Sequence, residues 1–181
     1  FEDFCFPSVK NQLNQNFKWF VFFDTDTPEE YRQRIYAFSK EFENFQPFFI
    51  DGMVNFLPSI KQKINEFTSE KYVITSRLDN DDCLHKNYVN VVQSYFNNQN
   101  YMAIDIIDGF SMQIRDKVRL GKMRYLFNPY ISLIESKEGC KSVWHKGHTY
   151  WKYEKNMIHV KNKPSWLTVI HKKNKENKFR G

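Results

Sequence analysis

The segment Tyr72-Val73-Ile74-Thr75-Ser76-Arg77-Leu78-Asp79-Asn80-Asp81-Asp82 places three carboxylates directly after a β-branched run. The run has the composition of a strand. Buried unpaired charge is costly, so the aspartates are expected on a loop beyond that strand. Carboxylates gathered on such a loop typically bind a divalent cation that neutralises a diphosphate. The alternative is a solvated acidic turn whose last residue caps the next helix. Spacing alone leaves both interpretations open.

The chain around this segment alternates between strand and helix patterns. In the first half, strand patterns cover residues 17–23, 45–50 and 71–75, and helical patterns cover residues 4–15, 27–42, 59–67 and 84–96. This alternation predicts an α/β fold with a mixed, mainly parallel sheet flanked by helices. The second half changes character, with strand patterns at residues 101–107, 109–114, 119–127, 130–134 and 166–170 and a short helix pattern at 144–151. Residues 109–114 and 119–127 are expected to form an antiparallel pair, so antiparallel strands are added in this half.

Two acidic positions fall at the predicted ends of strands. Asp24 ends the pattern at 17–23, and Asp79–Asp82 follow the pattern at 71–75. Ligands of α/β proteins bind beyond the carboxyl ends of the strands. Asp24 and the acidic loop are therefore predicted to face one ligand. The alternative for Asp24 is an ordinary loop aspartate that turns the chain into Thr25.

Composition indicates one folded domain over residues 1–181. Hydrophobic residues make up 41% and aromatic residues 18% of the chain, which argues against disorder. Apolar runs stay well short of the roughly 18 residues of a membrane span. Three cysteines without a CxxC pair favour a reduced, intracellular protein. We expect a cytoplasmic location, either free or at the cytoplasmic face of a membrane.

Charge is distributed unevenly along the chain. Residues 1–90 hold 10 Lys and Arg against 14 Asp and Glu, a net of −4, whereas residues 91–181 hold 17 against 7, a net of +10. A basic half favours an anionic partner such as a nucleotide diphosphate, an acidic glycan, a membrane surface or a nucleic acid. A solvated lysine-rich face is the alternative.

Several motifs together resemble the GT-A glycosyltransferases. In these proteins a helix and a glutamine turn lead to a strand that ends in aspartate, and an Asp-x-Asp motif follows a later strand. The matching segments here are Phe4-Cys5-Phe6-Pro7-Ser8-Val9 with Asn11-Gln12, Phe17-Lys18-Trp19-Phe20-Val21-Phe22-Phe23-Asp24, and Arg77-Leu78-Asp79-Asn80-Asp81-Asp82. Two later segments, Asn128–Glu135 and Trp166–His171, together with Asn174, Asn177, Arg180 and Gly181, resemble a bacterial rhamnosyltransferase family. The resemblance covers nearly the whole chain.

The resemblance implies a metal-dependent transfer of a sugar from a nucleotide diphosphate to a glycan or lipid-linked saccharide. Asp81 would bind Mn²⁺ or Mg²⁺, Asp79 would contact the ribose or the metal, and His171 would complete the metal site. Hard, oxygen-preferring cations are favoured over Zn²⁺ by this ligand set. The donor would be a dTDP- or UDP-sugar, with rhamnose as the sugar that the family suggests. Inverting chemistry is expected rather than retaining chemistry.

The same resemblance gives the remaining donor contacts. Asp24 would contact the nucleotide, and Arg77 would bind a phosphate or else only pair with one of the aspartates. Asn174, Asn177 and Arg180 would close over the phosphates as a lid. Without the resemblance, that last segment reads as a frayed terminus.

The catalytic base has several candidates. Glu135 is the first choice because it ends the matched Asn128–Glu135 segment, and its alternative is a structural ion pair. Four other residues compete for the role: Asp108, Glu138, His145 and His148. A rival interpretation assembles His145, His148 and His159 into a zinc site, although no cysteine or carboxylate is suitably spaced.

One departure from the family remains. GT-A domains begin with a central strand that carries part of the nucleotide pocket, and this sequence begins at Phe1 without it. We therefore expect either a truncated chain or an adapted fold. Two other functions stay open: a basic, aromatic nucleic-acid-binding module, and an inactive remnant of a transferase. Our prediction favours the transferase, without a stable nucleic-acid complex.

Overall fold

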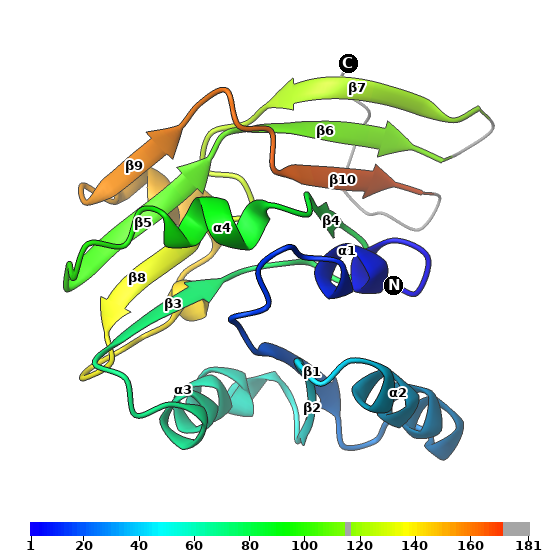
Figure 1. Ribbon diagram of the computed structural model, residues 1–181. Coiled ribbons are helices and arrows are strands. Elements are labelled where there is room, and N and C mark those ends of the chain that lie inside the picture. The colour runs from blue at the N-terminus through cyan, green and yellow to red at the C-terminus, as the bar shows by residue number, and fades with distance from the viewer. Residues whose placement is uncertain (115–116, 172–181) are drawn as a thin grey trace.

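The computed structural model describes residues 1–114 and 117–171. Its first half contains a parallel pair of strands, β1 (Trp19–Asp24) and β2 (Phe45–Ile50), joined by helix α2 (Glu29–Glu41). Side chains alternate across such a pair. One face of β1 packs with α2 and the short helix α1 (Cys5–Lys10), and the other packs with α3 (Phe56–Phe67). A 3₁₀ turn, η1 (Met53–Asn55), precedes α3. Helices therefore cover both faces of this pair (Figure 1).

The centre of the molecule is a four-stranded sheet in the order β3-β8-β5-β9. Its strands are β3 (Tyr72–Ser76), β8 (Ser132–Ser136), β5 (Tyr101–Ile106) and β9 (Met157–Val160). Helix α4 (Tyr88–Gln93) packs on one face against buried aliphatic side chains such as Ile104 and Ile134. Trp151 covers the other face from η3 (His148–Tyr153), close to η2 (Val143–His145).

A second four-stranded sheet has the order β4-β10-β6-β7. It contains β4 (Cys83–Leu84), β10 (Trp166–Ile170), β6 (Asp108–Gln113) and β7 (Arg119–Arg124). Strands β6 and β7 form the predicted antiparallel pair. Strand β10 runs parallel to β6 and antiparallel to β4, so β10 lies beside the segment that follows β3 (Figure 1).

The predicted α/β fold, with helices on mixed sheets, is confirmed. Among the described strands, three pairs are parallel and four antiparallel, a larger antiparallel share than expected. The helices predicted at 4–15 and 84–96 are shorter than expected. Helix α1 stops near Asn11 because the side chain of Gln12 then bonds the carbonyl of His85. Helix α4 starts late because Cys83 and Leu84 pair with β10. Sequence patterns missed β4 and β9.

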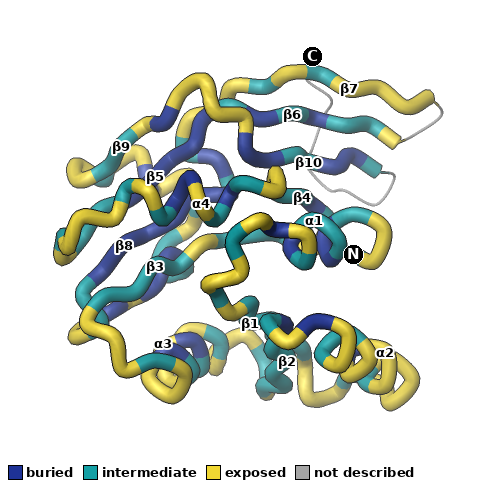
Figure 2. Tube along the Cα trace, viewed as in Figure 1, coloured by how far each residue is buried: buried dark blue, intermediate teal, exposed yellow. Residues whose placement is uncertain are grey.

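Burial separates the two halves. Strands β5 and β8 are almost entirely buried, whereas β1 and β2 are largely half-buried (Figure 2). The strands of the central sheet are thus buried more deeply than β1 and β2. Within the described residues, no helix has the length and apolar character needed to cross a bilayer.

Candidate functional site

The acidic loop, defined as residues 79–82, follows β3 and has two half-buried carboxylates and one buried carboxylate. The side chains of Asp79 and Asp81 are 40% and 32% exposed, whereas Asp82 is only 2% exposed. The amide of Asp82 donates to the carbonyl of Asp79 across 3.2 Å, which closes the turn. The loop therefore offers Asp79 and Asp81 to a ligand and uses Asp82 internally.

Asp82 fastens the loop to the interior. Its carboxylate accepts hydrogen bonds from the hydroxyl of Tyr130 at 2.5 Å and from the amide of Val169 at 2.9 Å. Burial raises the pKa of Asp82 to about 7, although these two hydrogen bonds act in the opposite direction. The predicted helix cap is wrong, because α4 begins only after Asn87 and Asp82 faces β10 instead.

Asp81 lies beside His171, the two residues that the family resemblance implied as metal ligands, and the metal role itself stays a prediction. The Nε2 atom of His171 lies 3.1 Å from Oδ2 of Asp81. Antiparallel pairing of β10 with β4 explains the contact. Leu167 pairs with Cys83, so the residues that follow Leu167 lie opposite the residues that precede Cys83. The two residues are 90 positions apart in sequence, so only the sheet register brings them together.

The pair has a geometry that suits a hard cation. The 3.1 Å between these two atoms is the length of an ordinary hydrogen bond, and it is also about the spacing of two adjacent ligands of an octahedral ion. Among residues 1–114 and 117–171, however, no group of three His, Cys, Asp or Glu side chains is placed to hold a metal. The described side chains could therefore provide only part of a coordination shell. Such an incomplete shell fits a Mg²⁺-type site, which keeps waters and substrate phosphates as further ligands.

Arg77 lies next to the loop with one donor unused. Its guanidinium carbon is 4.2 Å from the ring centre of Trp144, and its Nη2 atom is 3.5 Å from Oδ1 of Asp79. The Nε atom is buried and has no hydrogen-bond partner. A buried donor without an acceptor is costly, so this position favours an incoming anion. Both alternatives for Arg77, the ion pair and the phosphate, are compatible with this arrangement.

Asp24 ends β1 as predicted, but its contacts are local. Its Oδ1 accepts a hydrogen bond from the amide of Asp26 at 2.8 Å, and its carbonyl accepts from Thr27. The side chain is exposed. These contacts match the alternative of a loop aspartate, while the exposed carboxylate still leaves a nucleotide contact open as a prediction.

Glu135 is not brought to the acidic loop. It pairs with Val73, whereas Ser132 pairs with Ser76 at the end of β3, so Glu135 lies roughly 10 Å back along the sheet from that end. Its carboxylate is buried and accepts hydrogen bonds from the thiol of Cys140 and from the amides of Lys141 and Ser142. These are the contacts of a structural carboxylate. The catalytic role of Glu135 stays a prediction.

A stacked aromatic pair supports the acidic loop from behind. Tyr130 stacks on Trp166 with ring centres 4.8 Å apart, and the indole nitrogen of Trp166 donates to the carbonyl of Ile106 at 2.6 Å. A Cβ atom added at Gly109 would overlap this indole. Sequence reasoning missed this support, because its members are spread over strands whose register was unknown.

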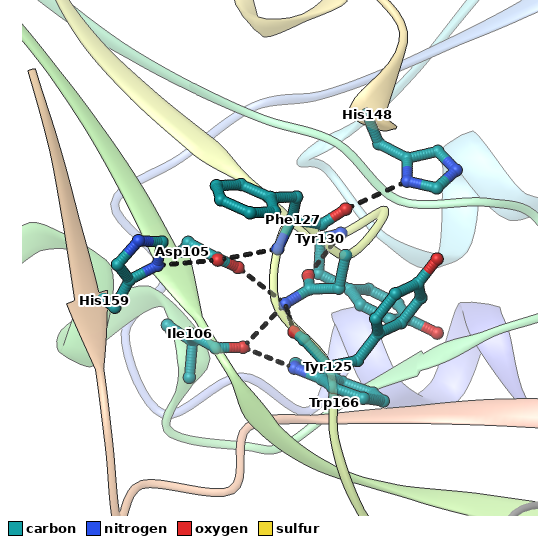
Figure 3. Close-up of polar contacts among 9 residues, drawn as sticks. Asp105, Ile106, Tyr125, Phe127, Tyr130, His148, His159 and Trp166 are labelled. Atoms are coloured by element: carbon teal, nitrogen blue, oxygen red, sulfur yellow. Dashed lines mark hydrogen bonds and ion pairs between the residues drawn. The ribbon is translucent and has the colours of Figure 1, made fainter. Parts of the chain in front are cut away.

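The turn that leads to Tyr130 is held by a buried polar network (Figure 3). Asn128 donates to Oδ1 of Asp105 at 2.7 Å and to the carbonyl of Ile106 at 3.0 Å, and accepts from the amide of Tyr130 at 2.9 Å. Asp105 also accepts from the amide of Phe127 at 2.8 Å. The polar groups named here all have hydrogen-bond partners. The network therefore fixes the conformation of the turn, and with it the position of Tyr130 just before β8.

The rival zinc site is not assembled. His159 Nδ1 lies 2.9 Å from Asp105, and His148 Nδ1 lies 3.0 Å from the carbonyl of Phe127, on the other side of that residue (Figure 3). His145 Nδ1 contacts the carbonyl of Ser142 instead. Among the described residues, these histidines therefore do not form part of a group of three side chains that could hold a metal ion. Asn174, Asn177 and Arg180 of the predicted lid lie outside the described residues.

Comparison with a solved structure agrees with the fold. Among solved structures, S. aureus TarS residues 1–349 in complex with UDP matches with a TM-score of 0.56 at 12% identity. The match covers 93% of this chain, and this chain spans 57% of that one. No curated protein sequence matches the chain. The fold is thus that of the GT-A-type glycosyltransferases.

The family follows from the sequence as a whole. The family model described as "Putative rhamnosyl transferase" matches residues 1–181. The chain belongs to that family, as the motifs around the acidic loop and His171 predicted.

Proposed function

We propose that the acidic loop holds the diphosphate of a nucleotide sugar, through Mn²⁺ or Mg²⁺, while the sugar is transferred to a glycan or lipid-linked saccharide. The observation that carries this proposal is the 3.1 Å contact between Asp81 and His171 beside the exposed Asp79. Asp81 and His171 are the metal ligands, and Asp79 binds the metal or the ribose. A bound cation of this kind offsets the negative charge that develops on the leaving diphosphate.

Arg77 is the phosphate contact in this proposal. Its stacking on Trp144 fixes the guanidinium plane, and its unpaired Nε–H supplies a donor that a phosphate oxygen accepts. Asp24 approaches the nucleotide from the end of β1, and Asn174 and Arg180 act from the segment beyond His171. The complex of TarS with UDP supports a uridine or thymidine diphosphate as the carrier. Rhamnose as the sugar and an inverting reaction rest on the family alone.

Calorimetry tests the proposal directly. UDP and dTDP are titrated into the protein with and without Mn²⁺, and the same titrations are made with the variants Asp81→Ala and Glu43→Ala. Glu43 is an exposed carboxylate, 94% exposed, far from the acidic loop in sequence and serves as the matched control. We expect metal-dependent binding by the wild type and by Glu43→Ala, and at least about tenfold weaker binding by Asp81→Ala. Equal, metal-independent binding by all three proteins would refute the metal-bridged donor site.

A further inference from the structure

The edge strand β7 exposes large apolar side chains at the outer edge of its sheet. Among the described strands, β7 pairs only with β6, so its other edge faces outward (Figure 1). Val118, just before the strand, is 75% exposed, and Leu120 within it is 65% exposed. Figure 2 shows that β7 is exposed along most of its length. Exposed apolar side chains that are neighbours, unlike scattered ones, indicate an interaction surface.

The register of the hairpin extends this apolar area onto β6. Exposed residues alternate with half-buried ones along β7, so Leu120 and Lys122 lie on its exposed face. Leu120 pairs with Met112, and Lys122 pairs with Phe110. Paired residues of an antiparallel ladder share one face, and both β6 residues are half-buried. The exposed face of the hairpin is therefore apolar across two strands.

This apolar area lies in a strongly basic segment. Residues 117–124 contain four Lys and Arg, and residues 117–134 contain no Asp or Glu. Arg124 is paired with Asp108, whose Oδ1 lies 2.7 Å from its Nε. Lys117 and Lys122 are exposed on either side of Leu120. We call Lys117, Val118, Leu120 and Lys122 the β7 surface, which combines apolar side chains with positive charge.

The charge and the apolar side chains together select one kind of partner. A second copy of the chain would bring its own basic β7 against this one, and like charges placed opposite each other destabilise a strand pair. Single-stranded nucleic acids bind basic grooves by stacking on aromatic rings, whereas Val118 and Leu120 are aliphatic. An anionic bilayer offers negative headgroups to the lysines and an apolar interior to the aliphatic side chains.

We propose that the β7 surface binds an anionic lipid bilayer. Val118 and Leu120 enter the boundary between headgroups and acyl chains, while Lys117 and Lys122 contact the phosphate headgroups. The strength of such binding depends on the buried apolar area and on the attraction to anionic lipids together. Two side chains of each kind give a peripheral and reversible attachment. The attachment requires neither nucleotide nor metal.

The β7 surface is also connected to the end of β10. The amide of Ile114, at the end of β6, donates to the carbonyl of Ile170 at 2.9 Å, and Ile170 precedes His171. A bilayer at the β7 surface therefore holds the sheet that carries His171, which suits an acceptor that is linked to a lipid. This consequence rests on the proposed function, whereas bilayer binding itself does not, so the calorimetric test above and the vesicle test below fail independently.

Vesicle co-sedimentation of the 181-residue chain tests the proposal. The probes are vesicles of phosphatidylcholine alone and vesicles in which about 30% of the lipid is phosphatidylglycerol. We expect at least about tenfold stronger partitioning into the anionic vesicles. Partitioning should weaken as salt is added, because salt screens the attraction between the lysines and the headgroups.

The first variant removes the apolar contribution. Val118→Ser combined with Leu120→Ser should weaken partitioning into anionic vesicles by at least about tenfold. Met53→Ser combined with Val54→Ser is the matched control, since Met53 and Val54 are 78% and 83% exposed in η1. We expect this control to bind as the wild type does.

The second variant removes the charge. Lys117→Gln combined with Lys122→Gln should also weaken partitioning into anionic vesicles by at least about tenfold and abolish most of its salt dependence. Lys40→Gln combined with Lys61→Gln is the matched control, because both lysines are exposed on helices α2 and α3 and the net charge changes equally. We expect nearly unchanged binding by this control.

The proposal is overturned if the wild type does not partition, or if it partitions equally into both kinds of vesicle. It is also overturned if either control pair weakens binding as much as its counterpart. Binding that needs the lysines but not Val118 and Leu120 would belong to a general polyanion site. A lipid-free dimer that Val118→Ser with Leu120→Ser dissociates would show that a second copy covers the β7 surface instead.

Discussion

The acidic loop and the turn around Glu135 both contain carboxylates that are buried or half-buried, but the exposure and the hydrogen-bond partners of Asp81 and Glu135 differ. At Asp81 the carboxylate is partly exposed and lies 3.1 Å from Nε2 of His171. At Glu135 the carboxylate is buried and enclosed by three donors from its own turn. A buried carboxylate enclosed by donors stabilises a fold, whereas a partly exposed one is accessible to a ligand. The contrast predicts a chemical role for Asp81 and a structural one for Glu135.

The largest expected effect is on the acidic loop. Asp81→Asn keeps the shape of the side chain and removes its charge, so we expect sugar transfer to fall by about 10²–10³-fold while the folded structure is retained. The measurement is kcat/KM with a nucleotide-sugar donor, together with the urea midpoint. Unchanged transfer, or a loss of transfer that follows a loss of stability, would place Asp81 among the structural carboxylates.

The second prediction is the inverse pattern at Glu135. Glu135→Ala leaves the amides of Lys141 and Ser142 buried without an acceptor, and we expect a loss of about 2–4 kcal/mol in the free energy of unfolding. Urea denaturation measures it. Glu135→Gln, which retains one acceptor oxygen, should lose less and keep kcat within a few-fold in the folded fraction. A collapse of kcat in a stable Glu135→Gln protein would instead support the catalytic base that the sequence predicted.

The third prediction concerns the support behind the acidic loop. Gly109→Ala introduces a methyl group into the indole of Trp166, which stacks on Tyr130 and so holds Asp82. We expect a loss of about 1–3 kcal/mol in unfolding free energy from the displaced ring. Gly147→Ala, where an added Cβ atom would make only ordinary contacts with the Tyr150 ring, is the matched control. A Gly109→Ala protein as stable as this control would show that the ring is not tightly held.

The two regions also differ in how far the sequence predicted them. The strand before the acidic loop, the exposed Asp79 and Asp81 and the contact with His171 followed from local patterns and from family resemblance. The burial of Asp82 did not, because its partner Val169 lies 87 positions away and depends on the pairing of β10 with β4. Local patterns report propensity and periodicity, but they carry no information on register between distant strands.

Glu135 failed to join the predicted site for a related reason. The pattern at 130–134 placed it at a strand end, but β8 runs antiparallel to β3, so its last residues lie away from the acidic loop. The direction of a strand depends on the connection that precedes it. The long segment between Gln113 and Ser132 includes β7, which the patterns did predict. The sequence of this segment nevertheless gave no indication of the direction in which β8 would run beside β3.

The smallest expected effect tests the electrostatics on the Glu135 side of the comparison. Glu154 lines the same cavity of about 470 Å³ as Glu135 and lies 3.0 Å from Lys146. Burial alone would raise the pKa of Glu154, but hydrogen bonds from Lys146, the amide of Asn156 and Tyr101 outweigh it and lower the pKa from its ordinary 4.5 to about 2.

Since the folded state prefers the ionised form, Glu154 stabilises the fold above about pH 4.5. This contribution is lost as the pH falls toward 2. We expect it to amount to about 1–2 kcal/mol after solvent screening. Urea denaturation of the wild type and Glu154→Gln should therefore show a stability difference at pH 6 that shrinks by pH 3. A difference that is constant between these two pH values would show that Glu154 acts through hydrogen bonds that do not depend on its charge.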